Sequence, residues 1–184
     1  GRFTFEKAAW LGPGPAVAAP LLQGPDPVPR FVDLCLASPN VQPRMPAELR
    51  DATHKLVWAY RPQLSSLESE SRLVHGDFGK RNIVVRSVAG RWSVAAVIDW
   101  EFAVSGSSLA DVGHFLRYEC DSRPRAEPHF TRGFLDAGGQ LPEDWRRVAN
   151  VLDLVALCEA LTHDELPEPV VVELVELVRA TVVR

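Results

Sequence analysis

The chain has 184 residues, enough for one well-cored domain, and its 46% hydrophobic and 24% charged content is ordinary for a soluble globular protein. No apolar run approaches the roughly 20 residues of a membrane-spanning helix, and the N-terminal residues lack the layout of a signal peptide. The three cysteines are few, odd in number and far apart, which argues against a disulfide framework or a zinc site. We therefore predict a cytoplasmic protein with reduced thiols and no membrane partner.

Charge is unevenly distributed along the chain. Residues 1–100 contain 12 Lys or Arg against 9 Asp or Glu, whereas residues 101–184 contain 8 against 15. An acidic C-terminal half argues against nucleic-acid binding and could receive a cationic small molecule, but a solvated acidic helical surface explains it equally well. The candidate acidic residues for such a ligand are Asp153, Glu159, Asp164 and Glu165.

The first 46 residues are rich in proline and lack a clear hydrophobic period. We expect an extended surface arm over residues 11–29, because proline has no amide donor and fixes its φ, followed by one short helix over residues 31–37. A better helix is predicted from residue 46 to about residue 60, where apolar residues recur at helical spacing and proline suits the first turn. Pro62 then breaks or kinks this helix.

Short strands are predicted next, at residues 72–75, 83–86 and 92–98. The last two are separated by a short turn that contains Gly90, which predicts a β-hairpin. From Ser108 onward the pattern is helical. Four helices are expected there, one capped by Ser108 and the others over residues 128–137, 142–161 and 167–182. The predicted fold class is α+β and mainly α-helical, with a small β-hairpin set into a helical body.

The segment LVHGDFGKRNIVV, residues 73–85, ends one strand on His-Gly-Asp and begins the next at an asparagine. Such a loop brings the carboxylate of Asp77 and the carboxamide of Asn82 to one site. The second hairpin strand ends in VIDW and delivers Asp99, which should lie beside Asn82 because the ends of paired strands are neighbours. Two carboxylates and an amide oxygen suit magnesium, which takes one or two protein carboxylates together with phosphate oxygens and water.

This layout is that of phosphoryl transfer by protein kinases. In those enzymes the Asp of H-R-D-x-x-x-x-N accepts the proton of the substrate hydroxyl, and the Asn and a later Asp hold the metal ions. Here Gly76 replaces the arginine, while the spacing from Asp77 to Asn82 is that of the kinase loop.

HGDFGKRN and AVIDWEFAVSGSSLADVGHF together resemble the aminoglycoside phosphotransferase family of small-molecule kinases. The loop of that family is H-G-D-x-x-x-x-N, and its metal-binding segment begins I-D-W or I-D-F. The resemblance extends from Phe3 to the C-terminus, and its sharp motifs lie within residues 74–115. It implies a protein-kinase-like fold and the use of magnesium and ATP.

The resemblance also implies roles for individual residues. By position, Asp77 would be the catalytic aspartate, with His75 supporting the catalytic loop. Asn82 and Asp99 would bind the metal ion and, through it, the nucleotide. Asp111 matches a family aspartate on the following helix that is usually structural.

Several of these residues have a second interpretation. His75 fits a hydrogen-bonded structural role at a strand end better than a proton shuttle. Glu101 could reach a second metal ion but fits an exposed or ion-paired position better. Lys80 and Arg81 could contact phosphate, although exposed loop cations are usually only solvated.

A kinase of this type also needs an N-terminal lobe that supplies a glycine-rich loop and a strand lysine. No G-x-G-x-x-G and no V-A-I-K-like strand precede Asp77, and GPGPA at residues 12–16 lacks the flanking strands of a nucleotide-covering loop. We therefore expect the C-terminal lobe alone, with the N-terminal lobe absent. This single domain, residues 1–184, would comprise a proline-rich arm and short helix (1–46), a helix and the catalytic hairpin (47–107), and a helical substrate-side region (108–184).

The predicted function is transfer of the ATP γ-phosphoryl group to a hydroxyl of a small molecule by the full-length parent protein, with the isolated chain inactive. Aminoglycosides are the substrates that name the family, but macrolides, choline, homoserine and sugars are substrates of other members, and the sequence does not separate them. The expected partners are this substrate and the missing N-terminal lobe or an associating chain. The alternative is a truncated, non-catalytic ligand-binding or regulatory module of the same fold.

Overall fold

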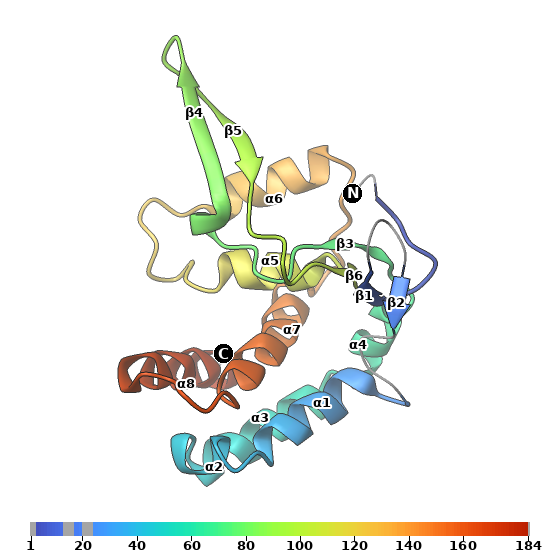
Figure 1. Ribbon diagram of the computed structural model, residues 1–184, viewed down its shortest axis with the longest axis vertical. Coiled ribbons are helices and arrows are strands. Elements are labelled where there is room, and N and C mark those ends of the chain that lie inside the picture. The colour runs from blue at the N-terminus through green and yellow to red at the C-terminus, as the bar shows by residue number, and fades with distance from the viewer. Residues whose placement is uncertain (1–2, 13–16, 20–23, 184) are drawn as a thin grey trace. The chain divides into compact units, whose positions relative to one another are not determined.

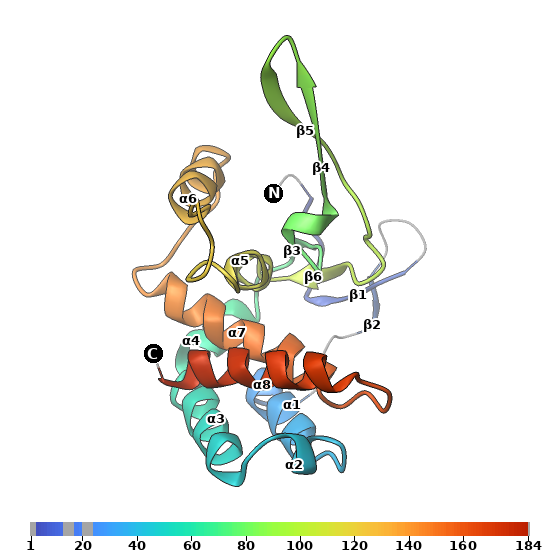
Figure 2. The same cartoon turned by 90° about the vertical axis from the view of Figure 1, so that its left-hand side faces the viewer.

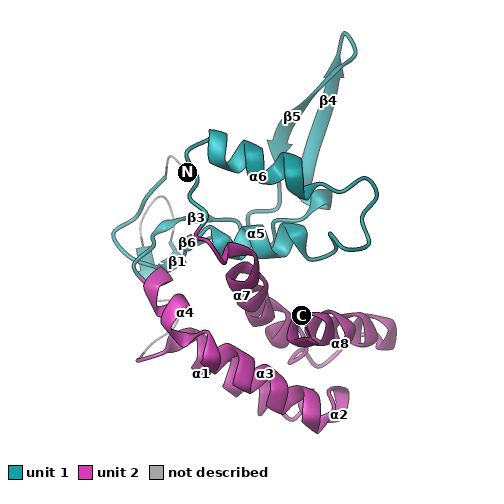
Figure 3. Cartoon of the chain, turned by 180° about the vertical axis from the view of Figure 1, so that it is seen from behind, with its two compact units in different colours: residues 1–21, 69–141 teal, residues 22–68, 142–184 magenta. Residues whose placement is uncertain are grey.

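The computed structural model describes residues 3–12, 17–19 and 24–183 (Figure 1). The chain divides into two compact units, one formed by residues 1–21 and 69–141 and the other by residues 22–68 and 142–184 (Figure 3). Most of the GPGPA stretch lies outside the described residues. Within the described ranges, no helix is both long enough and apolar enough to cross a bilayer.

The first unit contains a four-stranded antiparallel sheet with the strand order β2, β1, β6, β3. Its strands have three residues each: β1 (Ala9–Leu11), β2 (Val17–Ala19), β3 (Arg72–Val74) and β6 (Val104–Gly106). The sequence predicted β3 and missed the other three, because a three-residue strand is too short to show an alternating pattern. The pairing of β3 with β6 joins the strand before the loop of residues 75–82 to the strand that follows Asp99.

A separate β-hairpin is formed by β4 (Ile83–Val88) and β5 (Arg91–Val97). Its turn places Ala89 at φ 50° and Gly90 at φ 77°. Positive φ at both central turn residues matches the twist of the flanking strands, which is why such turns connect the strands of hairpins with two-residue loops. The 3₁₀ turn η1 (Lys80–Asn82) leads directly into β4, so the base of the hairpin lies at the predicted site (Figure 2).

Two helices complete the first unit, α5 (Leu109–Leu116) and α6 (Glu127–Asp136). Ser108 occupies the N-cap position of α5, but its side chain makes no capping hydrogen bond. The hydroxyl of Ser107 accepts the Leu109 N–H instead, at 3.3 Å. The predicted N-cap position is therefore correct, whereas the hydrogen bond to the first turn comes from the preceding serine, which only backbone geometry could distinguish.

The second unit is helical. It contains α1 (Pro27–Leu36), α2 (Val41–Arg44), α3 (Ala47–Ala59), α4 (Arg61–Leu67), α7 (Trp145–Ala160) and α8 (Glu168–Val183). Helix α7 packs against α1 and α8, and α3 packs against α1 and α8. The apolar side chains of these helices form one buried cluster, whose least exposed members include Val32, Val41, Met45, Val57, Val151, Leu154, Leu157, Leu161 and Val178.

The expectations for the N-terminal region need correction. The prediction of an extended arm over residues 11–29 is wrong at its C-terminal end, because helix α1 begins at Pro27. The short helix predicted over residues 31–37 therefore starts earlier than expected. Pro27 and Pro29 both lie in the first turn, where an N–H would have no intrahelical acceptor, so proline is tolerated there. Part of the arm also pairs in β1 and β2, and residues 13–16 and 20–23 lie outside the described residues.

The proline positions around α3 also differ in detail. Pro46 is the N-cap of α3 rather than its first helical residue. Pro62 ends α3 as predicted, but it does so by occupying the first turn of a new helix, α4, which the sequence pattern did not indicate.

Candidate active site

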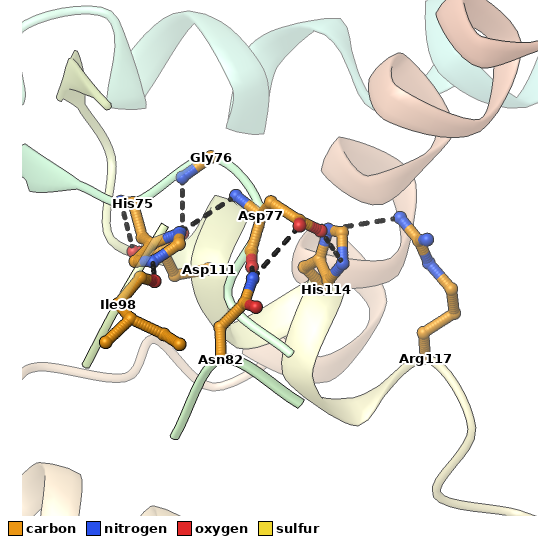
Figure 4. A network of polar contacts seen from close by, with 8 residues as sticks. All are labelled: His75, Gly76, Asp77, Asn82, Ile98, Asp111, His114 and Arg117. Atoms are coloured by element: carbon orange, nitrogen blue, oxygen red, sulfur yellow. Dashed lines mark hydrogen bonds and ion pairs between the residues drawn. The ribbon is translucent and has the colours of Figure 1, made fainter. Parts of the chain in front are cut away.

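The motif residues meet within the first unit, where the loop after β3, the base of the hairpin and α5 come together (Figure 4). Asp111, in the first turn of α5, anchors the loop: its carboxylate accepts the backbone N–H of His75 at 2.8 Å and that of Gly76 at 3.1 Å. Burial raises the pKa of the Asp111 carboxyl above its usual value, and these two hydrogen bonds oppose the shift. This position fits a structural role, as the family resemblance implied.

His75 connects the loop of residues 75–82 to the end of β5. Its ring is buried, Nε2 lies 2.8 Å from the Ile98 carbonyl oxygen, and Nδ1 lies 3.2 Å from the backbone N of Asp77. A carbonyl can only accept and a backbone N–H can only donate, so the ring is neutral with its proton on Nε2. The ring also packs against Trp100, with centroids 4.6 Å apart. Because both nitrogens are engaged, His75 is suited to supporting the loop rather than shuttling a proton.

Gly76 is required by the shape of the loop. Its φ is +84°, and a Cβ at this position would come within 2.3 Å of the carbonyl oxygen of Phe102. Only glycine combines left-handed backbone geometry with so close an approach to another backbone segment. This explains in physical terms why a glycine stands where the protein-kinase loop has an arginine.

Asn82 is bound directly to Asp77. Its Nδ2 donates to the Asp77 main-chain oxygen at 2.9 Å and to the carboxylate Oδ2 at 3.0 Å, and its side chain is buried. The Asn82 backbone N–H donates to the Gly79 carbonyl at 3.0 Å, which closes the 3₁₀ turn. These contacts fix the amide orientation and leave Oδ1 as the ligand atom that Asn82 can offer a cation.

Asp99 follows the strand paired with the start of β4. Ile83 pairs with Val97, and the Ile98 N–H donates to the Asn82 carbonyl at 3.0 Å. The backbone therefore places Ile98 opposite Asn82, and Asp99 follows one residue beyond this pairing. Asp99 has φ 68°, a conformation that aspartate tolerates better than most residues, and its side chain is exposed.

The sequence analysis did not single out His114 on α5. Its Nε2 lies 3.0 Å from Asp77 Oδ1, and its Nδ1 lies 3.3 Å from the Arg117 guanidinium (Figure 4). A signal for it was available: residues three apart on a helix share a face, and Asp111 had already been assigned to the helix after the loop. His114 is therefore part of the Asp77 environment.

Aromatic contacts also hold the loop. The Phe78 ring stacks on Phe115 of α5 at 5.5 Å, and Phe115 stacks on Phe130 of α6 at 4.3 Å. Such pairs add about 0.5–1.5 kcal/mol each beyond their area burial. The residue after Asp77 is thus packed against both helices of the unit.

The remaining candidates have more ordinary surroundings. Lys80 donates to the Ser122 hydroxyl at 3.0 Å, whereas Arg81 and Glu101 are exposed. The acidic candidates belong to the second unit. There Glu159 pairs with His163 at 2.9 Å, and Asp164 accepts the side-chain amide of Asn40 at 2.8 Å. Asp153 is buried, and Glu165 is exposed.

The donor atoms fit magnesium in chemical type. Asn82 offers an amide oxygen and Asp99 a carboxylate, both hard ligands. The described part of the chain contains no group of three or more His, Cys, Asp or Glu able to hold a metal ion by themselves. Magnesium often keeps several waters and takes its remaining ligands from substrate phosphates, so a pair of protein ligands is consistent with a metal–nucleotide site.

Comparison with known proteins identifies the family. Residues 16–151 match the sequence profile of the phosphotransferase enzyme family (APH). The chain belongs to this family. Among curated proteins it is similar to acyl-CoA dehydrogenase family member 11 of Homo sapiens, with 35% identity over 75 residues, which are 41% of this chain and 9% of that protein. The Pongo abelii protein of the same name is 36% identical over 66 residues, or 36% of this chain and 8% of that protein.

Solved structures show the fold. A thermostable mutant of the aminoglycoside phosphotransferase APH(4)-Ia, in ternary complex with AMP-PNP and hygromycin B, matches with a TM-score of 0.55 and 20% identity over 84% of this chain and 51% of that chain. The apo form matches with a TM-score of 0.54 over the same shares. The family member described here thus has the kinase-like, mixed α+β fold of these enzymes. It spans about half the length of the solved chains and less than a tenth of the curated relatives.

Proposed function

We propose that the protein transfers the γ-phosphoryl group of ATP to a hydroxyl of a small molecule, with Asp77 as the catalytic base. The observation that carries this proposal is the environment of Asp77: Asn82 and His114 each hydrogen-bond one carboxylate oxygen, and the loop is anchored on Asp111. A carboxylate held this way within a partly open loop is suited to accept a hydroxyl proton.

The reaction balances with the groups at hand. The substrate hydroxyl oxygen forms a bond to the γ-phosphorus, the bond from that phosphorus to the β–γ bridging oxygen breaks, and ADP leaves. The hydroxyl proton goes to Asp77. Asn82 and Asp99 would hold magnesium, which when bound neutralises charge on the phosphates. His75 supports the loop through its bonds to Ile98 and Asp77.

For the acceptor we propose a hydroxylated small molecule, with an aminoglycoside as the first class to test. The solved relative APH(4)-Ia was captured with hygromycin B and a nucleotide analogue, which supports this order of testing. The acidic candidates of the second unit favour a cationic acceptor only weakly, since Glu159 and Asp164 already have local partners.

We further propose that the chain acts as the C-terminal lobe of a kinase, and that the hairpin contacts an N-terminal lobe or an associating chain. Large apolar side chains of β4 and β5 are exposed, namely Val84, Val85, Val88, Trp92 and Val94. A two-stranded hairpin is marginally stable alone, and contiguous exposed apolar surface usually marks an interface. The isolated chain would then lack half of the ATP site and turn over poorly.

The alternative, a non-catalytic binding module of the same fold, is favoured by this same exposed surface, which a regulatory contact would also use. It gives no chemical reason for Asp77, Asn82 and Asp99 to occur together. Catalysis is therefore the better-supported function.

The test is an ATP-consumption assay on the protein at its full natural length, and on this chain supplied with the segment that precedes it. Aminoglycosides, choline, homoserine and neutral sugars would serve as acceptors. Magnesium-dependent phosphorylation of any of these acceptors supports the kinase function. Ligand binding without phosphoryl transfer in either form would establish the binding module instead.

A further inference from the structure

We infer that His114 is a positioning residue, which holds the carboxylate of Asp77 in the orientation that phosphoryl transfer requires. This inference rests on the proposed kinase function and adds one residue to it. His114 lies on α5, far from the loop in sequence, and its Nε2 is 3.0 Å from Asp77 Oδ1. Its side chain is 13% exposed, against 27% for that of Asp77, so the contact lies on the protein side of the carboxylate.

The protonation of His114 follows from its neighbours. Arg117 can only donate, so His114 Nδ1, which lies 3.3 Å from the guanidinium, is the unprotonated nitrogen. The carboxylate of Asp77 can only accept, so Nε2 carries the proton. Arg117 therefore selects the ring tautomer that donates to Asp77. The hydrogen bond at one ring nitrogen thus decides which nitrogen carries the proton, as is general for histidine.

The two oxygens of Asp77 then have separate donors on separate elements. His114 of α5 donates to Oδ1, and Asn82 of η1 donates to Oδ2. Rotation about the terminal torsion of an aspartate is soft, so one donor leaves its carboxylate poorly oriented and two donors define its plane. Each carboxylate oxygen has a second lone-pair site, which remains for the substrate hydroxyl.

A purely structural role for His114 is less consistent with the contacts. The loop backbone is already held by Asp111 at His75 and Gly76, and by Asn82 at the Asp77 carbonyl. The bond to His114 reaches the carboxylate alone. Loss of this bond should therefore disturb the direction of the carboxylate more than the fold of the loop.

Three variants of the protein at its full natural length test this inference. His114→Leu removes the donor at similar size, and His114→Gln keeps an amide N–H at the reach of Nε2. His54→Leu is the matched control, because the His54 ring bonds the carboxylate of Asp33 at 2.6 Å in the other unit. Turnover with magnesium-ATP and an active acceptor is measured for each, and thermal melting confirms folding.

We expect His114→Leu to lower kcat about 10-fold to 100-fold with little change in KM, because a misdirected catalytic group costs rate rather than binding. His114→Gln should recover most of kcat, and His54→Leu should keep the wild-type value. Nitrogen-15 NMR of the His114 ring should show the proton on Nε2, and Asp77→Asn should shift that signal.

The inference and the proposed function fail differently. The role of His114 would be overturned by any of three results: wild-type kcat in His114→Leu, no recovery of kcat in His114→Gln, or a His114 ring protonated on Nδ1 alone. Each of these results would leave the proposed kinase function intact. No phosphoryl transfer by the wild-type protein with any acceptor would overturn the proposed function, and the role of His114 with it.

Discussion

The side-chain amide of Asn82 donates to both the main-chain carbonyl and the carboxylate of Asp77, at 2.9 and 3.0 Å. The residue that would hold the metal ion is thus bonded to the residue that would accept the proton. Because the amide nitrogen is committed to Asp77, the amide oxygen is the atom left for a cation. One short loop would therefore set the geometry of both proposed functions.

Replacement of Asn82 by aspartate should destabilise the fold. The Asn82→Asp variant exchanges a buried donor for a carboxylate that faces the Asp77 carboxylate, so two hydrogen bonds are lost and two like charges are brought together. We expect the free energy of unfolding at neutral pH to fall by about 1–3 kcal/mol, measured by urea denaturation. A variant as stable as wild type would show that the two side chains are not in contact.

Gly76 should not tolerate even alanine. A methyl group there would come within 2.3 Å of the Phe102 carbonyl oxygen, in addition to the strain of φ +84°. Left-handed backbone geometry alone costs about 1–2 kcal/mol for a residue with a side chain. We expect Gly76→Ala to destabilise the first unit by more than this amount.

Gly90 provides the matched control for Gly76, because it has φ +77° and nothing within 4 Å of its would-be Cβ. Gly90→Ala should therefore show only the backbone strain. Thermal melting of both variants separates the two effects. Equal losses of stability would contradict the predicted clash with Phe102.

The three thiols should differ in reactivity. Burial raises the pKa of the Cys35 thiol to about 11 and that of Cys158 to about 12, whereas Cys120 is exposed. Only the thiolate reacts, so a chromogenic disulfide reagent at pH 8 should label one thiol in the native protein and three in denaturant. Rapid labelling of two or more native thiols would contradict the core described for the second unit.

Asp111 should give stability a specific pH dependence. Its pKa is raised from 3.8 by burial, so between that value and the higher folded value the native state binds more protons than the unfolded state. The free energy of unfolding contributed by this group therefore falls as pH rises through the window.

An Asp111→Asn variant lacks this titration and can accept only one of the two loop N–H groups. Wild type should be the more stable, and its advantage should shrink as pH rises above about 4. Chemical denaturation across this range measures the difference. An advantage that stays flat or grows with pH would contradict the raised pKa.

The sequence could predict the part of the site that is formed by residues close together in the chain. The loop from His75 to Asn82 and the hairpin that delivers Asp99 have strand lengths and turn residues that are visible locally. The spacing between Asp77 and Asn82 then fixed which groups would meet. The long helices α7 and α8 were likewise predicted to within a few residues, because proline opens each region and apolar residues recur along it.

What escaped prediction depends on tertiary contacts. β6 and β1 are three residues long and exist only because each pairs with a neighbour. His114 acquires its place from the packing of α5 on the loop, and the same histidine on a differently packed helix would be an ordinary surface residue. α1 began earlier than predicted because proline, normally a helix breaker, lies in its first turn.

The most direct test of the kinase proposal is the turnover of the Asp77→Ala variant, measured with magnesium-ATP and an acceptor that the wild-type protein phosphorylates. The account predicts a loss in kcat of at least about 100-fold, the usual contribution of a positioned general base, with folding retained because Asp77 is a partly exposed loop residue. A variant that folds normally and keeps near-wild-type kcat would contradict the assignment of Asp77 as the base.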